Sequence, residues 1–199
     1  MRAAGLILAG GTSRRMGGGH KFLLELAGKP LMAHVIERLA PQVATIAISA
    51  NCDPALLPAD YPVRADAAPS RGPLSGVLAG LRWAAEQDGI SHLATAAADT
   101  PFFPVDLVSR LTDAMGQSDV AIAVSHARSH PTFALWRSGL ANQLDAWLTS
   151  AERPSVLAFS ETLETVFVDF GASLEDPFFN VNTPEDLDAA RRRGLGAGN

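Results

Sequence analysis

The chain has 199 residues and a mass of 20.9 kDa, which suits one domain at about 150 residues per domain. Hydrophobic residues make up 47% of it and charged residues 19%, and this composition excludes an intrinsically disordered chain. Its 16 basic and 21 acidic residues give a net charge of −5, without the overall positive charge typical of nucleic-acid-binding proteins. We therefore expect a single domain over residues 1–199 that does not bind nucleic acid.

Cysteine usage and hydropathy indicate the compartment. Cys52 is the one cysteine, and a single thiol cannot form an internal disulfide, which favours a reducing compartment. No apolar run approaches the roughly 18 residues that a membrane span needs. The apolar N-terminal stretch precedes the basic pair Arg14 and Arg15, whereas targeting signals carry their positive charge first. We therefore expect a cytoplasmic protein with no membrane partner.

Short apolar runs alternate with amphipathic segments along the chain. In the first half, the patterns predict strands over 3–8, 43–50 and 92–98, and helices over 30–40, from 73 onward and through 107–115, with Pro30 at the first helical position. In the second half, they predict strands over 119–125, 132–136 and 165–170, helices over 141–149 and after Pro154, and a last helix that starts at Pro184 with Thr183 as N-cap. The alternation predicts a Rossmann-like α/β fold, with a mainly parallel sheet covered by helices on both faces. Ligands of such sheets bind beyond the carboxyl ends of the strands, here the loops after residues 8, 50, 65 and 98.

A glycine-rich loop follows the first strand, in the stretch Leu8-Ala-Gly-Gly-Thr-Ser-Arg-Arg-Met-Gly-Gly-Gly-His-Lys21. Its five glycines allow consecutive backbone N–H groups to curl around anionic oxygens, and residues 1–21 contain four basic residues and no acidic one. The spacing matches neither the P-loop nor the dinucleotide-binding fingerprint. A flexible surface loop with solvated arginines is the alternative. Because loops this rich in glycine usually serve a ligand, we predict a phosphate site.

Asp99 ends the apolar strand predicted over 92–98, and Pro101 stiffens the turn behind it. This position directs a carboxylate over the carboxyl edge of the sheet. Nucleotidyl transfer needs a hard cation such as Mg²⁺, for which one or two carboxylates suffice. Position alone leaves two roles open for Asp99, as a metal ligand or as the cap of the turn Asp-Thr-Pro.

Seven short motifs occur in order along the chain. They are LAGGTSRRMGGGHK, Gly28-Lys-Pro-Leu31, Ser49-Ala-Asn51, Gly72-Pro-Leu-Ser-Gly76, Asp99-Thr-Pro101, His130-Pro-Thr132 and Asn180-Val-Asn-Thr-Pro184. The ordered set resembles the nucleotidyltransferases, and within them the molybdenum cofactor guanylyltransferases. The resemblance implies the nucleotidyltransferase fold and a Mg²⁺-dependent enzyme. Such an enzyme transfers GMP from GTP to the terminal phosphate of molybdopterin or Mo-molybdopterin, giving a dinucleotide cofactor and pyrophosphate.

The resemblance also implies a role for each matching residue. Arg15, Lys21 and Asp99 would be catalytic, with Asp99 as the metal ligand. The nucleotide-binding half, about 1–105, would use Leu8, Ala9, Gly10, Gly11, Lys21, Asn51, Asp66 and Asp99, whereas the half from about 106 to 193 would face the pterin through His130, Thr132, Asn180 and Asn182. In the family, the second glycine of LAGG, here Gly11, accompanies guanine use, whereas relatives that use CTP carry an alanine in this stretch.

One position departs from the family pattern, because His20 stands where an aspartate usually precedes the motif lysine. This puts in doubt any role of that acid in holding Lys21 or a second metal, although a histidine could instead add to phosphate binding. Two alternatives stay open. One is a cytidylyltransferase or sugar-phosphate nucleotidyltransferase on the same scaffold, and the other is a non-catalytic nucleotide-binding protein. Protein partners would be those that deliver molybdopterin or the molybdoenzymes that accept the product.

Overall fold

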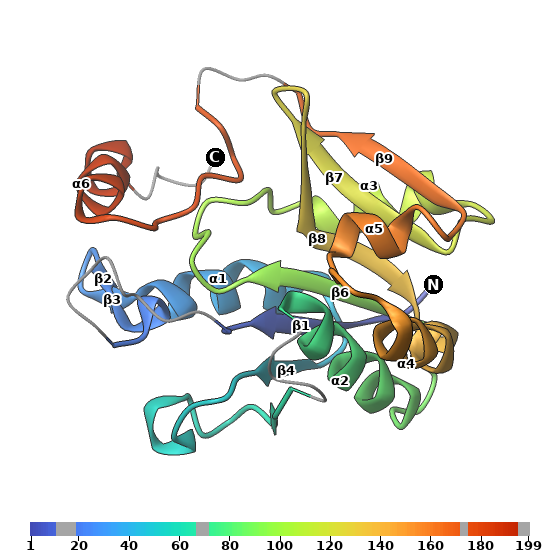
Figure 1. The fold of residues 1–199 in the computed structure, drawn as a ribbon. Helices are drawn as coiled ribbons and strands as arrows, with labels where there is room; N and C mark the ends of the chain where they lie inside the picture. The colour runs from blue at the N-terminus through green and yellow to red at the C-terminus, as the bar shows by residue number, and fades with distance from the viewer. Residues whose placement is uncertain (11–18, 67–71, 172–174, 195–199) are drawn as a thin grey trace.

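A seven-stranded sheet runs through the computed structural model, which describes residues 1–10, 19–66, 72–171 and 175–194 (Figure 1). In spatial order the strands are β5 (Val63–Arg64), β4 (Ile46–Ser49), β1 (Ala3–Leu8), β6 (His92–Ala97), β8 (Arg128–Arg137), β7 (Val120–Ser125) and β9 (Thr165–Asp169). Strand β8 is antiparallel to both of its neighbours, whereas the other pairings described in this sheet are parallel. The mainly parallel sheet predicted from the alternating pattern is confirmed.

Helices cover both faces of this sheet, as predicted. The first group, α1 (Leu31–Leu39) and α3 (Leu107–Met115), packs on one face, and α2 (Pro73–Ala85), α4 (Ala141–Ser150) and α5 (Val156–Ser160) pack on the other, which is toward the viewer in Figure 1. Strand β1 shows the physical reason, since alternate side chains point to opposite faces: Ile7 joins the core under α1, and Leu6 joins the core under α2. Short 3₁₀ turns at Lys21–Leu23, Ala40–Gln42, Pro54–Leu56 and Ser138–Leu140 complete the described elements.

The C-terminal helix α6 (Pro184–Arg193) returns to the N-terminal half of the chain (Figure 1). It packs beside the small hairpin of β2 (Glu25–Leu26) and β3 (Lys29–Pro30) through a separate apolar cluster of Leu26, Leu31, Val181, Leu187 and Ala190. Thr183 caps the helix as predicted, because its hydroxyl accepts the Asp186 N–H at 3.1 Å while the Asp186 carboxylate accepts the Thr183 N–H. The packing of α6 brings the segment before it next to Lys21.

Three of the predicted boundaries that differ from the observed ones do so for a clear local reason. The strand predicted from residue 43 begins at Ile46, because a 3₁₀ turn with Pro41 occupies the preceding residues. Pro30 is the N-cap of α1 rather than its first residue, since it also ends β3. The strand predicted over 132–136 spans Arg128–Arg137 with a bulge opposite Ile122 and Ala123, so His130 lies inside β8 and not before it.

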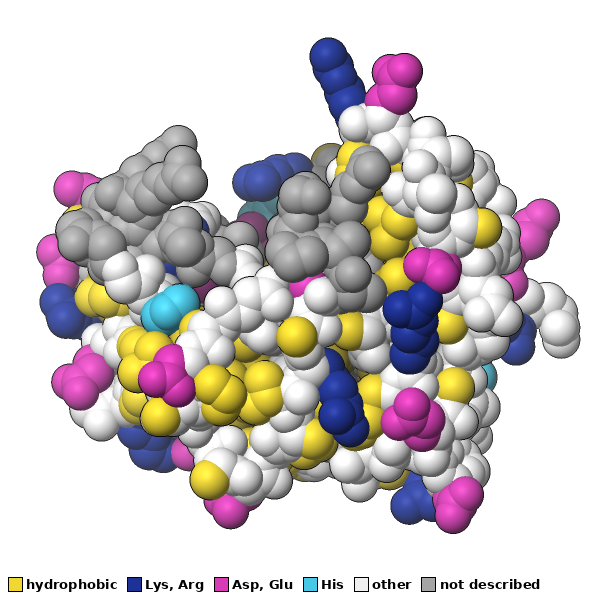
Figure 2. Space-filling view, turned by 60° about the horizontal axis from the view of Figure 1, so that its bottom comes forward, with side chains coloured by type: hydrophobic (Ala, Val, Ile, Leu, Met, Phe, Trp, Pro, Cys, Tyr) yellow, Lys and Arg dark blue, Asp and Glu magenta, His cyan; other side chains and the backbone are white. Residues whose placement is uncertain are grey.

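The outer surface mixes charges of both signs. On the face drawn in Figure 2, basic side chains stand singly among acidic and uncharged ones. None of the helices in the described ranges combines the length and the apolar content needed to cross a membrane.

Candidate functional site

A cavity of about 380 Å³ opens at the carboxyl ends of β1, β4 and β6. The described residues that directly follow these strands meet there because neighbouring parallel strands end at the same edge of the sheet. Nine of the residues predicted for the site line the cavity: Leu8, Ala9, Gly10, Lys21, Asn51, Asp66, Asp99, Thr132 and Asn180. Residues from both halves of the chain therefore contribute to one pocket.

A hydrogen-bonded cluster of three side chains forms part of the cavity wall where β4 and β5 end. Ser49 Oγ donates to Asp66 Oδ1 at 2.8 Å, and Asn51 Nδ2 donates to Asp66 Oδ2 at 2.7 Å. The Asn51 carbonyl oxygen accepts the backbone N–H of Asp66 at 3.0 Å, which orients the amide. Each carboxylate oxygen keeps capacity for a second donor, so Asp66 can accept a hydrogen bond from a sugar hydroxyl or a base N–H.

Gly76 on α2 faces this cluster without a side chain. A Cβ added there would lie 2.5 Å from Ser49 Oγ, 3.0 Å from Leu8 Cδ2 and 3.3 Å from Asp66 Oδ1. We expect Gly76→Ala to turn Ser49 away from Asp66. Because a hydrogen bond to a charged group contributes about 1.5–3 kcal/mol, the KM for the nucleotide that the motif resemblance implies should rise about tenfold.

Gly139→Ala is the matched control for this prediction, since no atom lies within 4 Å of a Cβ added at Gly139. Steady-state kinetics should show an unchanged KM for that variant. An unchanged KM in Gly76→Ala as well would contradict the role assigned to the Asp66 cluster.

A second part of the cavity wall pairs Asp99, at the end of β6, with Lys21. The side chains of Lys21 and Asp99 are 23% and 21% exposed, and Lys21 Nζ lies 3.9 Å from Asp99 Oδ2. The Lys21 ammonium also donates to the side-chain oxygen of Asn182 at 2.5 Å. A cation and a carboxylate that both reach the cavity suit a ligand that carries phosphates.

The C-terminal segment is bonded directly to the end of β6. The backbone N–H of Val181 donates to the Asp99 carbonyl at 2.9 Å, and the Thr100 hydroxyl donates to the side-chain oxygen of Asn180. These bonds bring Asn180 and Asn182 beside Asp99.

Burial raises the pKa of Asp99 above its usual value, and the Lys21 charge offsets this only in part. A folded-state pKa above the unfolded one means that the ionised carboxylate destabilises the fold. The stabilisation by the protonated form is complete below the ordinary aspartate pKa of about 3.9 and is lost as the pH rises through the raised value. We expect ligand-free Asp99→Asn to melt at or above the wild-type temperature at neutral pH. The difference should shrink as the pH falls toward about 4.

Asp145→Asn, a change at a half-exposed carboxylate on α4, serves as the control and should shift the melting temperature little at either pH. A lower melting temperature for Asp99→Asn at neutral pH would contradict the destabilising charge.

The oxygen donors present fit a magnesium ion that arrives with phosphates. Mg²⁺ in such sites takes one or two carboxylates and fills its remaining positions with phosphate oxygens and water. Asp99 offers a partly exposed carboxylate on the cavity wall, whereas both oxygens of Asp66 already accept hydrogen bonds. Within the described ranges, no three or more His, Cys, Asp or Glu side chains gather as an all-protein metal cage.

Several residues lie where sequence reasoning did not put them. Asn182 contacts Lys21 without lining the cavity, and the half-buried ring of His130 stacks on Phe178 with centroids 4.4 Å apart. Gly11 and Arg15 lie outside the described residues. The cavity is also lined by residues that were not predicted as site residues: His20, Phe22, Ser49, Cys52, Gly72, Pro73, Gly76, Ala97 and Ala98. Five of them lie within the quoted motifs, and the other four lie within two residues of one, which is the signal that could have found them.

The chain is similar to several proteins of known family. Residues 5–166 match the family model of the MobA-like NTP transferase domain. The chain is 46% identical over 195 residues to a molybdenum cofactor guanylyltransferase of Rhodopseudomonas palustris (strain BisB5), with 96% of this chain and 93% of the relative covered. It is 49% identical over 188 residues to the enzyme of the same name from Cereibacter sphaeroides, with 94% of each chain covered.

Two solved structures share the fold. Molybdopterin-guanine dinucleotide biosynthesis protein A from Archaeoglobus fulgidus superposes with a TM-score of 0.76 at 23% identity, over 98% of this chain and all of that one (100%). The 4-diphosphocytidyl-2C-methyl-D-erythritol synthase from Anaerococcus prevotii gives a TM-score of 0.75 at 12% identity, over 96% of this chain and 95% of that one. At these identities the likeness concerns the fold alone.

Proposed function

Because this chain belongs to the MobA-like NTP transferase family, among the molybdenum cofactor guanylyltransferases, we propose that it transfers GMP from GTP to the terminal phosphate of molybdopterin. The observation that carries this proposal is the meeting of the family's motif residues in one cavity, in a chain whose relatives of that name are 46% and 49% identical over almost its full length. The cytidylyltransferase alternative shares the fold but is not favoured by these relatives. A non-catalytic binding protein is likewise not favoured.

The nucleoside would lie between the end of β1 and the Asp66 cluster. Gly10 has no side chain, so the backbone after Leu8 can approach a base closely. Asp66, held by Ser49 and Asn51, would accept a hydrogen bond from the nucleoside. The triphosphate would then extend toward Lys21 and Asp99.

Lys21 would donate to phosphate oxygens, and the Asp99 carboxylate would hold Mg²⁺ beside the α-phosphate. When bound, the metal would neutralise the negative charge that develops on the phosphates. Asn180 and Asn182 would offer amides to the pterin substrate, together with Thr132 on the cavity wall.

The molybdopterin phosphate would attack the α-phosphorus in line, so that one P–O bond forms while the bond to pyrophosphate breaks. This nucleophile is already ionised at neutral pH and needs no base, so no residue is assigned that role. Catalysis would consist of positioning and electrostatic stabilisation.

The free thiol of Cys52, which lines the cavity, suits a reducing compartment such as the cytoplasm. Protein partners would deliver molybdopterin or accept the dinucleotide.

Incubation of the protein with GTP, Mg²⁺ and molybdopterin tests the proposal, with pyrophosphate and the dinucleotide product both measured. We expect equal amounts of the two products, little product when CTP replaces GTP, and none when a chelator removes the metal. A preference for CTP would instead indicate a cytidylyltransferase. Nucleotide binding without product formation would indicate a binding protein.

A further inference from the structure

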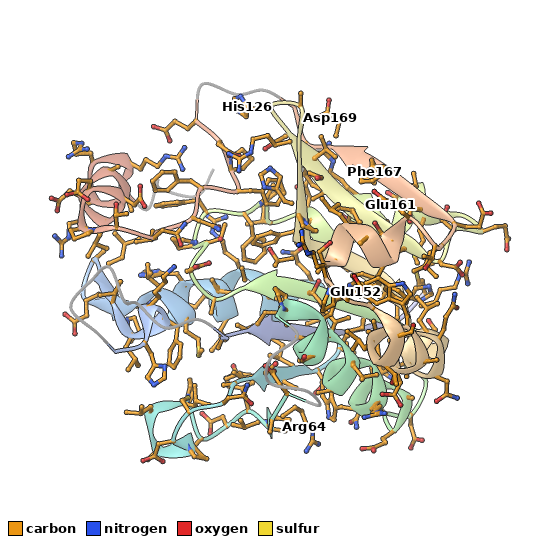
Figure 3. All side chains as sticks on the ribbon, in the orientation of Figure 1. Arg64, His126, Glu152, Glu161, Phe167 and Asp169 are labelled. Atoms are coloured by element: carbon orange, nitrogen blue, oxygen red, sulfur yellow. The ribbon has the colours of Figure 1, made fainter. Side chains whose placement is uncertain are left out.

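A segment spanning residues 175–182, here called the strap, carries Asn180 to the cavity wall and Asn182 to Lys21. It is held to the second half of the sheet at Asp176. The Oδ1 atom of Asp176 accepts from Ser125 Oγ at 2.8 Å and from the Phe178 N–H at 2.9 Å. Ser125 is the last residue of β7 and is fully buried. Figure 3 labels the next residue, His126, at the turn between β7 and β8.

His130 on β8 binds the same serine. Its Nε2 lies 2.8 Å from Ser125 Oγ, and its ring stacks on Phe178 at an interplanar angle of 23°. The serine hydroxyl has a single proton, which it gives to Asp176, so it can only accept from His130. His130 Nε2 must therefore carry a proton and donate it to Ser125 Oγ. The hydrogen bonds then run in one direction, from His130 to Ser125 and from Ser125 to Asp176.

The charge states of the two end groups agree with this order. Burial raises the pKa of Asp176, but the Phe178 N–H and the Ser125 hydroxyl stabilise the anion and hold that pKa below its usual value overall. Burial lowers the pKa of His130, and the Asp176 charge offsets this only in part, so the ring is neutral at pH 7. The serine gives its proton to the carboxylate and is fully buried, so the three residues do not form a nucleophilic triad.

Further contacts fix the strap between Asp176 and the cavity. Arg193 of α6 donates to the Asp176 carbonyl at 2.9 Å, and its guanidinium lies 4.8 Å from the centroid of the Phe179 ring. Four residues beyond Asp176, Asn180 accepts from the Thr100 hydroxyl. Because Asn180 is only four positions from Asp176, a displacement of Asp176 would also displace the two asparagines.

We propose that Ser125, His130 and Asp176 form a latch that positions Asn180 and Asn182 for the pterin substrate. His130 is then a positioning residue that acts through the strap and makes no pterin contact itself. This inference rests on the proposed function for its kinetic consequence, whereas the latch itself is a property of the protein without ligand.

Ser125→Ala tests the latch because it removes the shared hydroxyl without adding bulk. We expect kcat for GMP transfer to fall about tenfold, since a misplacement of about 1 Å at a reacting centre costs up to about 10²-fold. The KM for GTP should stay within about twofold, because the Asp66 cluster is built on β4 and β5, far along the sheet from β7. Amide hydrogen exchange over residues 175–182 should become faster in the absence of substrate.

Ser160→Ala is the matched control, since Ser160 is another buried serine whose hydroxyl donates locally, to the Leu157 carbonyl at 2.8 Å. It should leave both kcat and strap exchange unchanged. His130→Gln, which keeps a donor for Ser125, should retain more of kcat than His130→Leu.

A double-mutant comparison separates positioning from a merely structural role. In a background of Asn180→Ala and Asn182→Ala, Ser125→Ala should lower kcat no further, because the latch acts through those two side chains. A full tenfold loss in that background, or an unchanged kcat with unchanged strap exchange in Ser125→Ala, would overturn the proposal. If the wild-type protein forms no dinucleotide, the proposed function fails, and the exchange measurement alone still decides whether the latch exists.

Discussion

Asp99→Asn is expected to lower kcat for GMP transfer by about 10³-fold or more while the protein remains folded. The substitution keeps the size and the planar shape of the side chain but removes the charge that would hold Mg²⁺. Asp99 reaches the cavity from the end of β6, and Lys21 is 3.9 Å away, so the loss falls on the phosphate end of the site. Initial rates of pyrophosphate release at saturating GTP measure it.

Asp145→Asn on α4 again provides the comparison, because it removes a carboxylate that pairs with Arg82 at 2.8 Å on the surface. Its kcat should equal that of the wild type. Turnover of Asp99→Asn within about tenfold of the wild type in Mg²⁺ would remove Asp99 from the metal site. A loss of kcat without a loss of melting temperature would mark Asp99 as a residue kept for chemistry rather than for the stability of the fold.

Lys21→Ala is expected to lower kcat/KM for GTP by about 10²-fold, because it removes a positioned cation from the phosphates. The ammonium also donates to Asn182, so the truncation frees that side chain as well. Titration of GTP binding by calorimetry, beside steady-state kinetics, separates the loss of affinity from the loss of rate.

Lys29→Ala is the matched control for this change. Lys29 is a half-exposed lysine that pairs with Glu37 at 2.6 Å, and an exposed pair of this kind contributes about 0–1 kcal/mol. Its kcat/KM should stay within about twofold of the wild type. Equal kinetics for Lys21→Ala and Lys29→Ala would show that the Lys21 charge does not act on the nucleotide.

Sequence patterns located β1, β6 and the start of α2 closely. Strand β1 was predicted at its observed bounds, and β6 was predicted within one residue, because buried parallel strands form continuous apolar runs that end at Gly or Asp. The helix α2 begins at the predicted Pro73 for the reason given, since proline suits the first helical turn.

The hairpin of β7 and β8 was not predicted from local signals. Its two-residue turn, His126 and Ala127, has positive φ angles of 48° and 58° without the glycine or asparagine that usually marks such turns. Pro131 and the nearby bulge then break the alternation that would have revealed the start of β8. The antiparallel direction of β8 depends on which strands become neighbours, and no local pattern encodes that.

The sequence by itself determined which residues face the site from the strand ends. Gly10, Asn51 and Asp99 each follow a predicted strand, and parallel strands must bring their carboxyl ends to one edge, whereas Asp66 was assigned to the site by the family resemblance. Only the tertiary structure decided what these residues touch. The hydrogen bond between Lys21 and Asn182 joins residues 161 positions apart, and the bond between Ser125 and Asp176 joins residues 51 positions apart. The family motif identifies Asn180 and Asn182 as candidate site residues. Their positions in space depend on tertiary packing, which the periodicity of the sequence does not predict.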